Sequence, residues 1–178
     1  DWSNDNNFKI LQEQLEILVD YYIKNPDKPI CEFLDIKLAL LGTDTPRNTK
    51  FCGTGEQMIC YDINGNYYPC QAFAPQTLGD TSSKFKNTTT EMFTNGYQDE
   101  MCMNCIAYPV CRTCYGANNL CRGDYRKRDI NMCKFNKMCI LASAYIKYHR
   151  YINRDIEELS TEELLELKGI KAIQQLEL

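Results

Sequence analysis

Apolar positions recur with a helical period near both ends of the chain. In the segment Phe8–Ile23 they return every three or four residues, which predicts a helix with one buried face that ends at Asn25-Pro26. A similar pattern after Cys133 predicts an amphipathic helix that covers the preceding loops. The run Ser160-Thr161-Glu162-Glu163 has the form of a capping box and predicts a last short helix.

Strand and turn signals occupy the middle of the chain. Residues 30–41 are apolar, and we expect a strand in their first half. Residues 57–61 and 66–70 flank an Asn64-Gly65 pair, which predicts a tight β-hairpin because both positions of the pair tolerate positive φ. Residues 74–94 are polar and predict a surface connection with one short helix at most.

The composition of the chain narrows the class of protein. Its 178 residues are 44% hydrophobic, enough to bury the core of one compact domain, with or without a short appendage. The net charge of −4 gives no general attraction to nucleic acid or to anionic lipid, and the apolar runs are too short to cross a membrane. No secretory signal is visible at Asp1. We therefore expect a cytoplasmic protein with no nucleic-acid or membrane partner.

Cysteine is the residue that calls for chemistry. The chain has 11 cysteines, and eight of them lie between Cys52 and Cys121. An odd total in a chain without export signals argues against a disulfide framework. Metal or cluster ligation is the interpretation that remains.

The spacing of these cysteines separates the possible metal sites. Cys102-x2-Cys105 and Cys111-x2-Cys114 are pairs that can reach one metal centre through a tight turn. The two pairs are five residues apart, a much shorter gap than in a zinc ribbon. The four thiols therefore lie close in sequence but need not all serve one ion.

This pattern resembles the SPASM domain, the C-terminal extension of many radical S-adenosylmethionine enzymes that mature peptides and proteins. Cys52, twelve residues, Gly65, four residues and Cys70 match the first half of the family pattern. The second half is matched by Cys102, Cys105, Cys111 and, as the last member, Cys133. The resemblance covers residues 50–140, with one departure: two residues, not three, separate Cys111 from Cys114.

The resemblance implies two 4Fe-4S clusters with interleaved ligands. The first cluster would be held by the hairpin cysteines and one later residue: Cys52, Cys60, Cys70 and Cys114. The second would be held by Cys102, Cys105, Cys111 and Cys133. Cys60 lies outside the short pattern, but family members with a fully ligated first cluster have a cysteine in this loop.

The resemblance also implies a fold and a domain plan. The expected fold class is α+β: a small cysteine-rich two-cluster domain with a β-hairpin and covering helices, preceded by the last helix and strand of a (β/α) barrel. Residues 1–49 would be the end of the barrel and a linker, residues 50–140 the SPASM domain, and residues 141–178 a helical extension.

The function implied is that of an auxiliary module for electron transfer and substrate positioning in an enzyme that modifies a peptide or protein. The Cys-x3-Cys-x2-Cys motif that binds the catalytic cluster is absent, so we expect a fragment that is not catalytic alone. S-adenosylmethionine and a third 4Fe-4S cluster would belong only to the full-length enzyme. The implied partners are a peptide or protein substrate and a reductant such as a ferredoxin or flavodoxin.

The remaining candidate residues have simpler interpretations. We expect Cys31 to be buried on the strand and Cys139 on a helix face, whereas Cys121 could replace Cys114 or Cys133 as a ligand. His149 is expected not to be a ligand. Four tyrosines that adjoin ligands are expected to shield sulfur from water: Tyr67, Tyr68, Tyr108 and Tyr115.

Two other classes of protein remain possible from the residues alone. A zinc-binding structural or interaction module would use the same thiols, although the interleaved spacing fits it poorly. A two-cluster ferredoxin would need a Cys-x2-Cys-x2-Cys-x3-Cys-Pro run, which the chain lacks. Iron and sulfide content distinguishes these classes.

Overall fold

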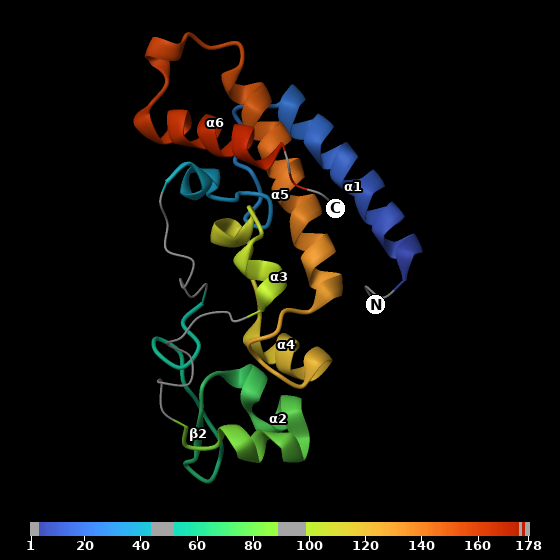
Figure 1. Ribbon diagram of the computed structural model, residues 1–178, viewed down its shortest axis with the longest axis vertical. Helices are drawn as coiled ribbons and strands as arrows, with labels where there is room; N and C mark the ends of the chain where they lie inside the picture. The colour runs from blue at the N-terminus through green and yellow to red at the C-terminus, as the bar shows by residue number, and fades with distance from the viewer. Residues whose placement is uncertain (1–3, 44–51, 89–98, 175, 177–178) are drawn as a thin grey trace. The chain divides into compact units, whose positions relative to one another are not determined.

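The computed structural model describes residues 4–43, 52–88, 99–174 and 176. It is mostly helical, with one two-stranded antiparallel sheet, and therefore has an α+β composition (Figure 1). The chain divides into two compact units that alternate along the sequence. Unit 1 contains residues 1–46, 105–111 and 130–178, and unit 2 contains residues 47–104 and 112–129.

Three long helices form most of unit 1. They are α1 (Asp5–Lys24), α5 (Ile130–Tyr151) and α6 (Thr161–Ile173), and α1 packs along α5 (Figure 1). The α1 helix begins where the side chain of Asn4 accepts a hydrogen bond from the backbone of Asn6. The predicted helices at both ends of the chain are thus confirmed, including the capping box that opens α6.

The strand expected in residues 30–36 is wrong. The backbone N–H groups of Leu34 and Asp35 both donate to the carbonyl of Cys31, which curls the chain into a turn. The next backbone groups bind α5: the N–H of Ile36 donates to Ser143 Oγ at 3.4 Å, and its carbonyl accepts from Lys147 Nζ at 2.9 Å. Side chains of α5 thus supply hydrogen-bond partners for the backbone of Ile36, and the segment does not need a neighbouring strand to pair with.

The segment after this turn packs closely on α6. It forms the short 3-10 helix η1 (Leu38–Gly42), and a Cβ added to Gly169 of α6 would lie 2.1 Å from the carbonyl oxygen of Leu38. Beside this contact, the buried ammonium of Lys147 binds the buried carboxylate of Glu166 and lies 3.3 Å from Asp35 Oδ1. Unit 1 therefore combines an apolar core with one buried ion pair.

Unit 1 also contains two further short helical segments. The 3-10 helix η5 (Tyr108–Val110) lies between Cys105 and Cys111, and η6 (Ile156–Glu158) connects α5 to α6. Ala107, Val110 and Cys111 belong to the same hydrophobic core as α1 and α5. The cysteine loop of unit 1 is therefore anchored by its apolar neighbours.

Unit 2 contains the predicted hairpin. Strands β1 (Cys60–Tyr61) and β2 (Tyr67–Tyr68) pair antiparallel, with Cys60 opposite Tyr68. Gly65 has φ of 77° as expected at the bend. The loop is longer than a two-residue turn because Asp62 Oδ1 accepts hydrogen bonds from the backbone of both Asn64 and Asn66, each at 2.9 Å.

The segment after the hairpin contributes more structure than its polarity predicts. It forms η2 (Gln71–Phe73), α2 (Pro75–Leu78) and η3 (Gly79–Phe85), and residues 89–94 lie outside the described part. The rings of Phe73 and Phe85 lie 4.5 Å apart, and both meet the edge of Tyr125. The supposed surface connection thus supplies an aromatic core to unit 2.

Two further helices hold the later cysteines of unit 2. They are α3 (Glu100–Met103) and α4 (Tyr115–Arg122). Asn118 of α4 is 2% exposed, and its amide donates to Thr113 Oγ1 and to the carbonyl of Tyr125 while accepting from the backbone of Asp129. One buried amide therefore fixes the chain on both sides of α4.

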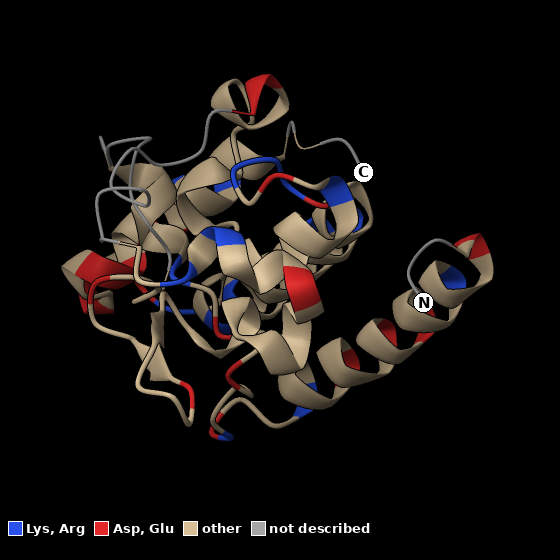
Figure 2. Ribbon diagram, turned by 90° about the horizontal axis from the view of Figure 1, so that it is seen from below, with Lys and Arg blue, Asp and Glu red and all other residues tan. Residues whose placement is uncertain are grey.

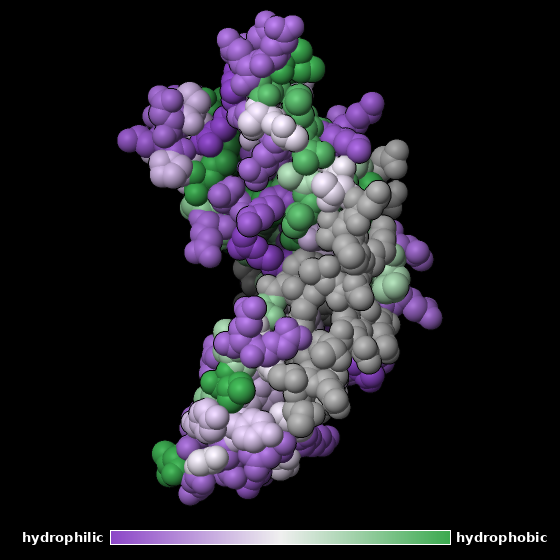
Figure 3. Space-filling view, turned by 90° about the vertical axis from the view of Figure 1, so that its left-hand side faces the viewer, coloured by the Kyte–Doolittle hydropathy of each residue, from purple (hydrophilic) through white to green (hydrophobic). Residues whose placement is uncertain are grey.

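In the described part of the chain, no helix is long and apolar enough to cross a membrane. The face seen in Figure 3 mixes hydrophilic residues with small groups of hydrophobic ones.

Candidate metal centre

All four cysteines of the first predicted set belong to unit 2. Cys70 is buried, Cys52 and Cys60 are partly exposed, and Cys114 is exposed. They come from four separate places: the turn before the hairpin, strand β1, the end of the hairpin and the start of α4. Their contacts show how closely the fold gathers them.

Cys70 and Cys114 occupy equivalent positions before two touching helices. Cys70 is the N-cap of η2 and Cys114 is the N-cap of α4. A Cβ added to Gly116, two residues after Cys114, would lie 2.3 Å from the Cβ of Ala72, two residues after Cys70. Only glycine permits this approach, which brings the two N-cap cysteines together.

Cys52 joins this pair through a threonine. Its Sγ lies 2.9 Å from Thr54 Oγ1, and the hydroxyl of Thr54 also binds the thiol of Cys70. The side chain of Thr54 is buried, and the N–H of Gly55 donates to the carbonyl of Pro69 at 2.8 Å. The turn that carries Cys52 is therefore tied to the strand that leads to Cys70.

The electrostatics of Cys70 reflect its neighbours. Burial raises the pKa of the Cys70 thiol above its ordinary value, and the nearby thiols of Cys114 and Cys52 raise it further. The Thr54 hydroxyl and the backbone N–H of Ala72 lower the pKa by binding the thiolate form. Three cysteines distant in sequence thus share one environment, together with two hydrogen-bond donors suited to sulfur ligands.

Cys60 faces the same side of the hairpin. It is paired directly with Tyr68, and side chains opposite each other in a pair of strands project on one face. Cys70 lies two residues after Tyr68 with an extended backbone (φ −167°), so it keeps that face. Burial and the carboxylate of Asp62 raise the pKa of Tyr68, and the Cys60 thiol adds to the effect.

The second predicted set is divided between the units. Cys102 is buried in α3 of unit 2, whereas Cys105, Cys111 and Cys133 belong to unit 1. Cys105 and Cys111 flank η5, and Cys133 lies in the first turns of α5. The assignment of these four cysteines to one cluster stays a prediction.

The described residues contain no ready-made site for a single metal ion. Among the described residues, no group of three or more His, Cys, Asp and Glu side chains is placed to hold one metal ion.

The leftover cysteines Cys31 and Cys139 lie beside each other in unit 1. Cys139 is buried on α5 as expected, but Cys31 lies at the turn and not on a strand. Burial raises the pKa of Cys139 to about 12, and the thiol of Cys31 contributes to the rise. Both belong to the hydrophobic packing around α5, consistent with small apolar side chains.

Cys121 is exposed on α4. Partial desolvation of its sulfur and the carboxylate of Asp129 raise the pKa of its thiol, as desolvation also does at Cys70. Asp129 is thus a local partner of Cys121, and the alternative in which Cys121 replaces Cys114 or Cys133 as a ligand stays untested.

The aromatic candidates are mostly interior. Tyr68, Tyr108 and Tyr115 are buried, and Tyr67 is partly exposed. His149 packs against the rings of Tyr145 and Tyr148 on α5, at centroid distances of 4.6 and 5.6 Å. The expectation that His149 is not a ligand stays a prediction.

Sequence reasoning missed three residues that organise the first set. Thr54 bridges two cysteines, Gly116 permits the approach of η2 and α4, and Asn118 fixes α4. A glycine two residues after a ligand was the one local signal available. The roles of Thr54 and Asn118 depend on long-range contacts that no spacing rule reveals.

Comparisons of the chain with protein-family models, with curated proteins and with solved structures found no match. The assignment therefore depends on the residues themselves and on the cysteine pattern.

Proposed function

We propose that this chain is an auxiliary iron–sulfur module of a radical S-adenosylmethionine enzyme that modifies a peptide or protein. It would hold two 4Fe-4S clusters, the first through Cys52, Cys60, Cys70 and Cys114. The second would be held through Cys102, Cys105, Cys111 and Cys133. When bound, such clusters supply one-electron transfer.

One observation carries the proposal: Cys52, Cys70 and Cys114 share one environment in unit 2. The interleaved pattern requires Cys114 to join the hairpin cysteines and to leave its sequence neighbours. The boundary between the units falls after Cys111, so Cys114 folds with the hairpin and Cys111 does not. A simple four-cysteine finger would keep these two residues together.

The residues of unit 2 suit a cluster chemically. Four thiolates are the ligand set that a cubane requires, and hydrogen bonds to sulfur stabilise the negative charge that it carries. Thr54 and the N–H of Ala72 supply such donors at Cys70, and Cys114 is the N-cap of α4, the end of the helix whose N–H groups lack intrahelical partners. The chain's own part is to position thiolates and donors and to limit contact with water.

The basic residues near the later cysteines bind other side chains, backbone or rings of the chain. Arg126 forms an ion pair with Asp124 at 3.1 Å, and Arg122 donates to the carbonyl of Arg128 at 2.7 Å. In unit 1, Lys134 lies over the ring of Phe8 and 3.7 Å from Asp5. The proposal therefore depends on the hydrogen-bond donors close to the sulfur atoms and makes no use of positively charged side chains.

Metal and sulfide analysis of the full chain, purified without oxygen, tests the proposed function. A brown protein with about eight irons and about eight sulfides is the expected result. A colourless protein that holds zinc and no sulfide would refute it in favour of a structural zinc module.

A further inference from the structure

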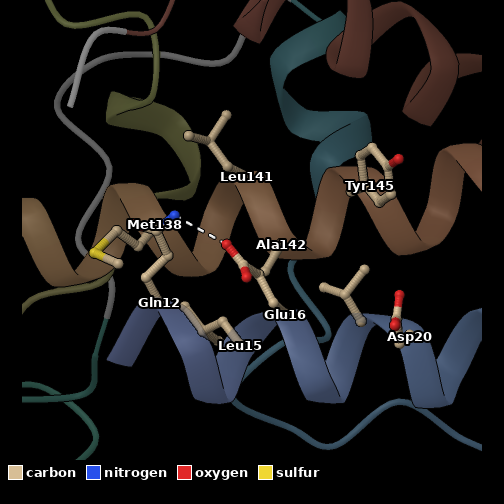
Figure 4. A pocket seen from close by; sticks show the side chains of 9 residues that line it. Gln12, Leu15, Glu16, Asp20, Met138, Leu141, Ala142 and Tyr145 are labelled. Carbon is tan, nitrogen blue, oxygen red and sulfur yellow. Dashed lines mark hydrogen bonds between the residues drawn. The ribbon is translucent and has the colours of Figure 1, made fainter. Parts of the chain in front are cut away.

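A groove between α1 and α5 of unit 1 is unrelated to the cysteines. Its volume is about 520 Å³, and both of its walls belong to unit 1 (Figure 4). Nine residues line it: Gln12, Leu15, Glu16, Val19, Asp20, Met138, Leu141, Ala142 and Tyr145.

Two local features leave the space between the side chains of these helices unfilled. Ala142 has a short side chain at its centre, and Gln12 Nε2 donates to Glu16 Oε1 at 2.9 Å (Figure 4). The Gln12 amide is therefore used along α1 and does not bridge to α5. The floor is apolar because Leu15 and Val19 of α1 meet Met138 and Ala142 of α5.

The two walls of the groove differ in chemistry. On α1, Gln12, Glu16 and Asp20 are spaced four residues apart and form one polar row, two of them carboxylates. On α5, Leu141 and Tyr145 form an apolar wall, and the side chain of Tyr145 is 55% exposed. None of the described lining residues is Lys or Arg, and acidic positions recur along α1 (Figure 2).

From this arrangement we infer that the groove binds an amphipathic helical peptide segment with Lys or Arg along one edge. Glu16 and Asp20 are about 6 Å apart along the axis, one helical turn, which matches basic residues four positions apart on a facing helix. The apolar face of such a segment would cover the floor and pack against Tyr145. Opposite charge selects this occupant over an acidic one.

The inference is independent of the metal centre, because all of the lining residues are outside the cysteine loops. A failed binding test would leave the proposed function standing, and a colourless zinc protein would leave the groove in place.

Peptide binding to the full chain tests the inference. The probe is a labelled synthetic helix of about three turns, with leucines on one face and lysines four residues apart on its edge, and the control peptide has glutamates in place of those lysines. Fluorescence anisotropy is expected to show binding of the basic peptide that weakens with salt, and none of the acidic peptide. Equal binding of both peptides, or of neither, would overturn the inference.

Matched variants locate the site. Glu16→Gln with Asp20→Asn is expected to weaken binding about five- to tenfold, because two exposed ion pairs are lost, whereas Glu13→Gln on the same helix leaves it unchanged. Tyr145→Ala is expected to weaken binding and Tyr148→Ala, which does not line the groove, to have no effect. Undiminished binding in the Glu16/Asp20 double variant or in Tyr145→Ala would overturn the site. A dimer of the chain that Tyr145→Ala abolishes would also overturn it, because a second copy of the chain would then occupy the groove.

Discussion

The two units achieve compactness by different means. Unit 1 packs helices of 20, 22 and 13 residues around an apolar core. In its described residues, unit 2 has strands of two residues each and a longest helix of eight, yet it contains five of the eight proposed ligands. Such short elements are marginal alone. The comparison teaches that unit 1 is stabilised by burial along long helices, whereas unit 2 has short elements to which the proposed cluster would add the most stability.

Withholding iron gives the largest expected difference between the units. Binding energy at a metal site adds to folding energy, so the iron-free chain should lose amide protection in unit 2, most of all around its cysteines. Helices α1 and α6 of unit 1 should stay protected. Hydrogen exchange read by mass spectrometry, with and without iron and sulfide, makes the measurement. Equal protection of unit 2 in both samples would remove the distinction.

The buried ion pair of unit 1 gives the next largest effect. Lys147→Met leaves the carboxylate of Glu166 buried without its cation, and we expect a loss of about 3–5 kcal/mol in the free energy of unfolding of unit 1. Lys171→Met, at an exposed position of α6, should change it by less than about 0.5 kcal/mol. Urea unfolding followed by circular dichroism compares them, and equal small effects would show that the pair is unimportant.

A substitution at the close approach of η2 and α4 should change stability by less, but the sign of the change is diagnostic. Gly→Ala in an uncrowded helix stabilises by about 1 kcal/mol. Gly116→Ala should instead destabilise unit 2 by about 1–3 kcal/mol and reduce its iron, because the new methyl group meets Ala72.

The control for this variant is a second substitution. Adding Ala72→Gly removes the obstructing methyl group and should restore both the stability and the iron content. If Gly116→Ala alone were stabilising, the adjacency of Cys70 and Cys114 would lose its main geometric support.

Local signals predicted the elements that depend on local contacts. The period of α1, the Asn64-Gly65 bend and the capping box of α6 could all be found because their determinants lie within a few residues. The strand expected at residues 30–36 was wrong because Ser143 and Lys147, more than a hundred residues away, bind the backbone of Ile36. Apolar composition alone does not distinguish a buried turn from a strand.

The candidate site shows the same difference between features set by local sequence and features set by long-range contacts. The resemblance to the SPASM pattern implied that Cys52, Cys70 and Cys114 act together, and their common environment is consistent with that grouping. The Thr54 bridge and the Asn118 anchor could not be predicted, since each depends on side chains that meet only after folding. The second ligand set stays a prediction from the resemblance, because its members are divided between the units.

The most direct test of the account is whether Cys70 and Cys114 serve one cluster. Iron and sulfide are measured in Cys70→Ala, in Cys114→Ala and in the double variant, all prepared without oxygen. Each single variant should fall from about eight irons to about four, and the double variant should stay near four, since a shared site is lost only once. Losses that sum, with the double variant near zero, would place the two cysteines at different centres and contradict the account.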